Sequence, residues 1–343
     1  MKQLMLLLLS FSLAISSQAQ QDSLYNMLQE GMQLSDKGDY SEAIAKYDQI
    51  IGSNSQYYLA YAEKSFSLYQ WGKYQDCIDL CKKVLKEYSG NEKNGNIYVN
   101  YGSSLDALGK PADALKIYKE GITKFPGYEM LYFNKGITEY SNKAYDDAVK
   151  DMEKSISLNP AHASSHQGLA LSIYPKNKIA SAMALIGFLL LEPRGERAEK
   201  NLKMLQEIFG SNVQQKDEKN ITISVSPDML DTKEKGEDDF HQTAFMLTMA
   251  GALDHSEVSK VMTPAQLMEK KLEVLAEIKV SKKGFFSNFY VTLLSDLQSA
   301  KLLETASHVI LLSDKTGADQ QWLQDHQDKT EEYTKWMEAR MKK

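Results

Sequence analysis

Several histidines in this 343-residue sequence are placed where they could bind a metal or act on a substrate. His162 and His166 lie one helical turn apart, a spacing that could hold a metal ion, but no third ligand is evident. Asp254, His255 and Glu257 lie together before a predicted helix, and such clusters are usually solvated loops or caps. We therefore predict neither a metal site nor a catalytic centre from these residues.

Cys77 and Cys81 lie four residues apart on a predicted helix, on the same face. A disulfide within one helical turn is poorly set geometrically, so we favour two buried small apolar residues over a disulfide or redox pair. His308 lies in an otherwise apolar stretch and is predicted to be a hydrogen-bonded core histidine.

Known catalytic signatures are missing from the sequence. It has no glycine-rich phosphate loop, no nucleophile elbow and no zinc-binding His-Glu-x-x-His. The formal net charge is −6 and no run of five basic residues occurs, whereas nucleic-acid binders need a basic face. These features predict a protein that is not an enzyme, carries no cofactor and does not bind nucleic acid.

The first nineteen residues are typical of a secretory signal peptide. Lys2 gives a positive start, residues 4–15 are almost wholly apolar, and Ser17 and Ala19 are the small residues that a signal peptidase reads. An apolar run of about twelve residues is too short to span a bilayer as a helix. We expect cleavage after Ala19 and a periplasmic or secreted mature chain with no membrane span. No cysteine follows that could carry a lipoprotein anchor.

A turn followed by an alanine-centred helix recurs five times along the front half of the chain. The central small residues are Ala43, Cys77, Ala114, Ala148 and Ala182. Their spacings are 34, 37, 34 and 34 residues. A second set of small residues precedes them, at Gly31, Ser65, Gly102, Gly136 and Ala170. Larger residues follow at Tyr47, Cys81, Tyr118, Met152 and Ile186. Small residues would let two helices approach closely, and the larger residue would fill the gap beside them.

This pattern resembles the tetratricopeptide repeat, whose period is 34 residues. The resemblance covers residues 24–196 and implies an all-α right-handed superhelix of helical hairpins, in which each hairpin buries its apolar face against its neighbours. Residues 197–237 are predicted to form a capping helix and a polar linker. Residues 238–343 are predicted to form a helical bundle.

The resemblance also implies that the first helix of each repeat lines a concave groove that binds a partner protein or peptide. The residues assigned to this groove are Met32, Phe66, Tyr69, Asn100, Phe133, Asn134, Ile137, Tyr140, Leu171 and Tyr174. Leu28, Ala62 and Val99 stand where some family members have cationic residues that clamp a peptide carboxylate. The sequence thus predicts an aromatic groove for an apolar peptide or helix, in an adaptor or scaffold.

Two alternatives stay open. The carboxy-terminal half could fill the groove, leaving other surfaces for assembly, or it could hold an enzyme or small-ligand site near His241, His255 or His308. The segment 179–191 is apolar nearly all round, so we expect later helices to pack over it. The oligomeric state is left open.

Local patterns divide the carboxy-terminal half into elements. Helices are expected at residues 195–209, 238–253, 264–280, 285–298, 299–313 and 318–342. Ile221, Ile223 and Val225 alternate with polar residues and predict a short extended segment. Thr263, Pro264 and Gln266 have the pattern of a capping box.

Overall fold

The structure is a computed structural model that describes residues 21–88, 95–216, 220–231, 233–256 and 261–342. The chain divides into two compact units, residues 1–138 and 139–343, and each is described by itself. The predicted leader lies outside the described residues. Helices dominate both units, which confirms the predicted all-α class. Among the described residues, no helix is long and apolar enough to cross a bilayer.

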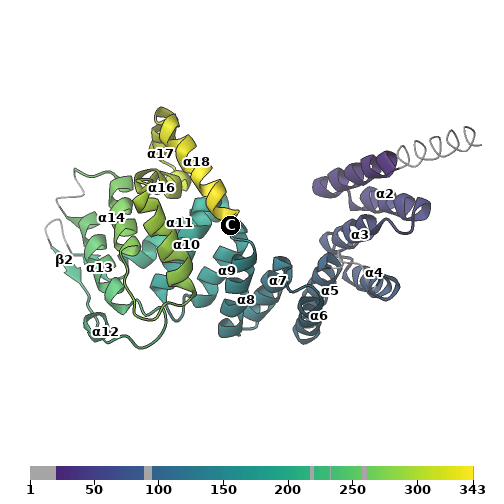
Figure 1. Ribbon diagram of the computed structural model, residues 1–343, viewed down its shortest axis with the longest axis horizontal. Coiled ribbons are helices and arrows are strands. Elements are labelled where there is room, and N and C mark those ends of the chain that lie inside the picture. The colour runs from purple at the N-terminus through teal and green to yellow at the C-terminus, as the bar shows by residue number, and fades with distance from the viewer. Residues whose placement is uncertain (1–20, 89–94, 217–219, 232, 257–260, 343) are drawn as a thin grey trace, which may run out of the picture. The chain divides into compact units, whose positions relative to one another are not determined.

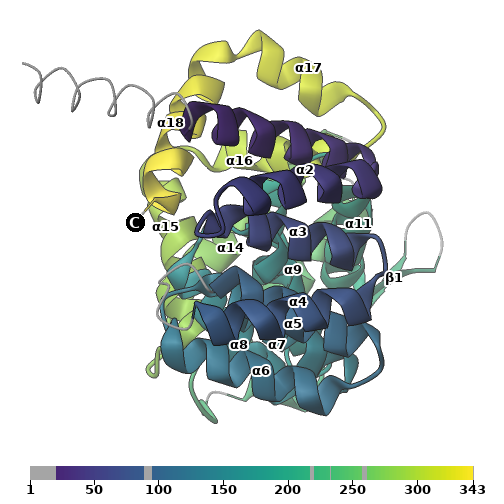
Figure 2. The same ribbon diagram turned by 90° about the vertical axis from the view of Figure 1, so that its right-hand side faces the viewer.

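Five helical hairpins occupy the predicted repeat positions (Figure 1). In the first unit the helices are residues 21–37, α2 (Tyr40–Ser53), α3 (Tyr58–Gln70), α4 (Tyr74–Glu87), α5 (Gly95–Ala107), α6 (Pro111–Lys124) and the start of α7 (Glu129–Ser141). In the second unit they are the end of α7, α8 (Tyr145–Leu158), α9 (Ala163–Ile173) and α10 (Lys178–Leu191). Successive helices of the first unit pack side by side from α3 to α6 (Figure 2).

The turns within the hairpins are made by residues in the left-handed region of backbone space. Gly38, Gly72 and Gly109 have φ of 87°, 76° and 72°, and Lys143 takes the same place in the fourth hairpin with φ of 62°. Glycine adopts this conformation without a steric cost, which explains its recurrence in the motif.

Glycine also permits the close approach of the two helices in a hairpin. A Cβ atom added at Gly31 would lie 2.6 Å from the Tyr47 ring, and one added at Gly102 would overlap the Tyr118 ring. Both tyrosines are fully buried. The pairing of a small residue with a larger one sixteen positions later therefore fixes the spacing of these helices, as the sequence predicts.

Helix α10 is covered on several sides. Every residue from Ala180 to Leu190 is buried, because α9, α11 (Glu196–Gly210), a π-helical turn at Ser287–Val291 and α16 (Leu303–Ile310) all pack against it. This confirms that later helices cover the apolar segment 179–191. It also confirms the capping helix, which begins at Glu196 and buries Ala198, Leu202 and Leu205.

The rest of the second unit is a helical bundle with one small hairpin of strands. Its further elements are β1 (Val213–Gln215), β2 (Ile221–Ile223), α12 (Pro227–Leu230), α13 (His241–Ala252), α14 (Pro264–Ala276), α15 (Thr292–Ser299), α17 (Ala318–Asp325) and α18 (Gln327–Met341). β1 and β2 pair antiparallel, with Val213 opposite Ile223. The extended segment and the Thr263 capping box are confirmed.

The prediction of one continuous helix near the carboxy terminus is wrong, because the structure has two helices there. The predicted helix 318–342 divides at His326, where φ is −118° and ψ is 56°. The His326 backbone N–H is bonded to the Trp322 carbonyl, while the Thr330 hydroxyl donates to the carbonyls of Leu323 and His326. These local side-chain bonds satisfy the free carbonyls at the break, so α18 can leave in a new direction.

The close approach at Gly102 gives a test of the repeat packing. We expect Gly102→Ala to lower the free energy of unfolding by about 1–3 kcal/mol, because the Tyr118 ring must move to make room. The matched control is Gly52→Ala in α2, where nothing lies within 4 Å of the added Cβ. It should be neutral or stabilise by up to about 1 kcal/mol. Urea unfolding measures both, and equal effects would contradict this account of the hairpin.

Candidate functional site

The predicted inner face of the first two repeats carries exposed apolar side chains. Phe66 in α3 is 40% exposed, Leu59 in the same helix is 37% exposed, and Tyr25 is 54% exposed. Met32 is half-buried and packs on the core of the first hairpin. Large apolar residues are usually buried, so an exposed group of them is typical of a binding surface.

Part of this predicted face is used to join neighbouring repeats. The Asn100 side chain is buried and donates to the Ser65 hydroxyl at 2.8 Å and to the Ala62 carbonyl at 3.4 Å. The Asn134 amide donates to the Met130 carbonyl of its own helix at 2.8 Å, and its oxygen accepts from Ser103 at 3.4 Å. Asn100 is therefore committed within the array and does not belong to an exposed binding surface.

The recurring tyrosines of the motif are arranged in pairs. Tyr69 lies 5.8 Å from Tyr74, centroid to centroid, in the second repeat. Tyr140 lies 5.7 Å from Tyr145 in the fourth. Each pair joins the end of a first helix to the start of the second, and Tyr69 and Tyr140 are half-buried. The groove assignment did not include the partner tyrosines, Tyr74 and Tyr145, which contact two of its residues.

The remaining predicted groove residues keep part of their surface. Phe133 and Ile137 of α7 lie in the first unit, and Phe133 is half-buried there. In the second unit Leu171 is half-buried, and Tyr174 is 36% exposed with the Lys178 ammonium 5.9 Å from its ring. The carboxy-terminal helices thus do not cover Tyr174, whose side chain remains exposed to solvent.

Acidic side chains border the exposed apolar group. Glu63 of α3 is half-buried, and burial raises the pKa of its carboxyl, with a further rise from the negative charge of Asp36. A cation brought to this place would relieve the repulsion between two carboxylates. This is the opposite of the cationic clamp that binds a peptide carboxylate.

His166 is a structural residue that joins the fifth repeat to the bundle. It is fully buried, with Nδ1 2.7 Å from the Tyr290 hydroxyl and Nε2 2.9 Å from the Pro160 carbonyl. Burial lowers the pKa of His166 to about 4, so the ring is neutral, donates to Pro160 and accepts from Tyr290. Neither nitrogen is free to bind a metal, and no group of three potential metal ligands occurs in the described part of the chain.

Two of the other candidate histidines, His308 and His241, are also hydrogen-bonded within the bundle. His308 is buried with Nδ1 2.7 Å from the Asp319 carboxylate and its ring stacked on Trp322, which confirms the predicted core role. His241 binds the Asp239 carboxylate through Nδ1. That carboxylate raises the pKa of His241. The predicted polar cluster before α14 contributes Asp254 to an ion pair with the buried Lys271 at 2.8 Å, while Glu257 lies outside the described residues.

Glu153 of α8 is a partly buried carboxyl group in the second unit. Burial raises the pKa of its carboxyl to about 7, and the negative charge of Asp238 adds to the rise. Asp238 itself caps the helical stretch that begins at Phe285. Its carboxylate accepts from the backbone N–H groups of Gly284, Phe286 and Ser287 at 2.8–3.0 Å. The contact between Asp238 and residues 284–287 joins positions far apart in sequence, and no local pattern predicted it.

Comparison with known proteins identifies the repeats. The family described as tetratricopeptide repeat matches residues 102–171. A WD and tetratricopeptide repeats protein of Mus musculus is 34% identical over 74 residues, which are 20% of this chain and 11% of that protein. A small glutamine-rich tetratricopeptide repeat-containing protein of Saccharomyces cerevisiae is 29% identical over 102 residues, 30% of this chain and 29% of that protein. The chain thus spans less than a third of either relative.

Solved structures of repeat proteins are also similar. A thermophilic tetratricopeptide-repeat protein of Thermus thermophilus has a TM-score of 0.47 and 17% identity, over 53% of this chain and 98% of that one. PilF of Pseudomonas aeruginosa has a TM-score of 0.46 and 18% identity, over 56% and 86% of the two chains.

The raised pKa of Glu153 predicts a pH-dependent stability. Between its ordinary value of 4.5 and about 7, the folded chain holds this proton more tightly than the unfolded chain, so stability falls as pH rises through that window. We expect Glu153→Gln to raise the melting temperature at pH 8 and to change it little at pH 4. The exposed Glu207→Gln of α11 is the control. A Glu153→Gln effect independent of pH would contradict this assignment.

Proposed function

We propose that the hairpins over residues 24–196 are all tetratricopeptide repeats, as the family match over residues 102–171 supports, and that this chain is an exported, non-enzymatic adaptor that binds a segment of a partner protein. Proteins built from these repeats are generally scaffolds for protein–protein interaction. The proposed binding surface is the inner face of the repeats in the first unit, centred on α3.

The exposure of Phe66 carries this proposal. Its ring is 40% exposed although the neighbouring residues Ser65 and Ser67 are buried, so the helix turns a large aromatic side chain outward at a position the motif assigns to ligand contact. Leu59 and Tyr25 extend the same exposed apolar group to the neighbouring first helix. A fixed aromatic side chain of this kind supplies a large contact area at a small entropic cost, as binding anchors do.

The charge beside this group supports a class of partner. The Glu63 carboxyl is half-buried beside the negative charge of Asp36, and both effects raise its pKa. A segment that combines an aliphatic or aromatic residue with a lysine or arginine would satisfy both features. We therefore propose a basic apolar peptide or helix as the partner segment, rather than a carboxy-terminal carboxylate.

Export is the second part of the proposal and depends on residues 1–19. The short positive start, the apolar stretch and Ala19 together support a cleaved leader. A mature chain that begins at Gln20 would leave the first helix of the array, residues 21–37, at its amino terminus. The adaptor would then work in a periplasmic or extracellular space.

A peptide selection tests the binding surface. Twelve-residue peptides selected on the mature chain should share an apolar side chain and a basic residue. Phe66→Ala should weaken their binding by about 2 kcal/mol, roughly thirty-fold in Kd, as loss of an anchor does. Leu108→Ala is the control, because Leu108 is also 40% exposed but lies in an outer turn. Calorimetry that finds equal affinities for both variants would reject the surface.

The leader is tested by expression of the full chain in a Gram-negative host. We expect the periplasmic fraction to contain a product whose first residue is Gln20, identified by intact mass. Ala19→Lys should block this processing, because the peptidase requires a small residue there. Gln21→Lys, two positions downstream, is the control. A chain that stays in the cytoplasm with the leader attached would contradict export while leaving the peptide surface untouched.

A further inference from the structure

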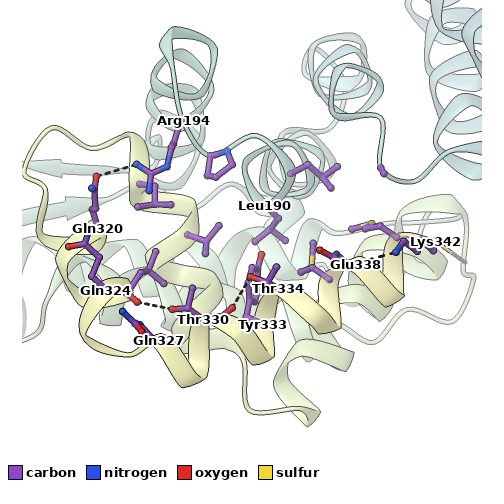
Figure 3. Close-up of a pocket in the computed structure, with 18 residues that line it drawn as sticks. Leu190, Arg194, Gln320, Gln324, Gln327, Thr330, Tyr333, Thr334, Glu338 and Lys342 are labelled. Carbon is purple, nitrogen blue, oxygen red and sulfur yellow. Dashed lines mark hydrogen bonds and ion pairs between the residues drawn. The ribbon is translucent and has the colours of Figure 1, made fainter.

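A cavity of about 710 Å³ is lined by residues of the second unit alone. One wall is the end of α10 with the loop that follows it, and the other is formed by α16, α17 and α18. Figure 3 shows Leu190 opposite Tyr333 and Thr334 of α18. Its volume is within the range of about 300–1,000 Å³ that is usual for small-molecule sites.

The middle of the cavity is apolar. Tyr333, Met337 and Met341 recur on one face of α18 and are buried, and Leu190 and Leu323 complete the walls. From Thr330 to Lys342 this face runs for about 18 Å at the rise of an α-helix. Methionine side chains are flexible and polarisable, so they adapt to apolar ligands of varied shape.

The two ends of the cavity differ in charge. At one end the Arg194 guanidinium donates to the Gln320 side-chain oxygen at 3.2 Å, and among the described residues it forms no ion pair with a carboxylate. At the other end the Lys342 ammonium is 4.0 Å from the Glu338 carboxylate, so these two charges offset each other (Figure 3). One exposed cation, Arg194, is therefore left at a defined end.

We propose that this cavity binds a long-chain monocarboxylate, with its carboxylate at Arg194 and its hydrocarbon chain along α18 toward Met341. A guanidinium matches a carboxylate with two parallel N–H donors, and Gln320 and Gln324 add amide donors at the same end. The middle walls suit a hydrocarbon because they are built from leucine, methionine and the tyrosine ring. An extended peptide would bring backbone N–H and C=O groups to these walls, where the Thr330 and Thr334 hydroxyls already donate to backbone carbonyls of the carboxy-terminal helices.

Binding of a matched set of amphiphiles tests the charge assignment. Calorimetry on the mature chain should show that laurate binds one to one, and that dodecanol and dodecyltrimethylammonium bind at least tenfold more weakly. Arg194→Gln should weaken laurate binding about tenfold and leave dodecanol binding unchanged. Lys203→Gln, an exposed charge on α11 outside the cavity, should bind laurate as the unchanged chain does. Equal binding of laurate and the cationic amphiphile, or an unaffected Arg194→Gln variant, would overturn the proposal.

Photolabelling locates the ligand without changing the cavity. A laurate analogue with a diazirine near the end of its chain should label residues of α18 near Met337 and Met341, and excess laurate should remove the label. Label confined to the first unit would overturn the proposal, as would displacement by an apolar peptide but not by laurate. Phe66→Ala should leave the labelling intact, so this site and the peptide surface can fail separately.

Discussion

A helical hairpin cannot bury its own apolar face, and the last hairpin of a stacked array has no further repeat to cover it. In this protein the fifth hairpin solves that problem with α10, which is apolar on every side and buried along its length. The capping helix α11 covers one side and the π-helical turn at Ser287–Val291, with α16, covers another. Removal of this apolar surface from water holds the second unit together. The hydrogen bond between His166 and Tyr290 joins the fifth repeat to the bundle.

The groups around that junction also set its response to pH. His166 is held neutral by burial, so its contribution to stability is present above about pH 6.5 and is lost as the pH falls toward 4. Glu153 acts in the opposite direction, because its carboxyl is better accommodated when protonated. The two effects offset each other between about pH 4.5 and 6.5, where the folded chain holds a neutral histidine and a protonated glutamate, so the junction is most stable across that interval and loses stability on either side of it.

The repeat array divides its polar and apolar side chains between two tasks. Ser35, Asn100, Ser103 and Asp106 form hydrogen bonds between neighbouring first helices, and these bonds hold one repeat against the next. Residues that do not join repeats, above all Phe66 and Tyr25, remain exposed. The same face is therefore partly structural and partly available, which explains why a position-based assignment of the groove includes Asn100. The amphiphile cavity at α18 belongs to a different part of the chain and uses different chemistry.

The sequence by itself determined the five hairpins, their turns, the buried cysteines, the capping helix and the core role of His308, because each follows from local spacing and from a pattern repeated five times. The leader was likewise a prediction from sequence alone. Only the tertiary structure decided that Asn100 is committed inside the array, that Asp238 caps a helix about fifty residues away, that His326 breaks the last helix, and that α18 faces Leu190 across a cavity. Local pattern records which residues must be buried or must turn the chain. It does not record which distant partner each one meets, because that depends on how elements far apart in sequence pack together.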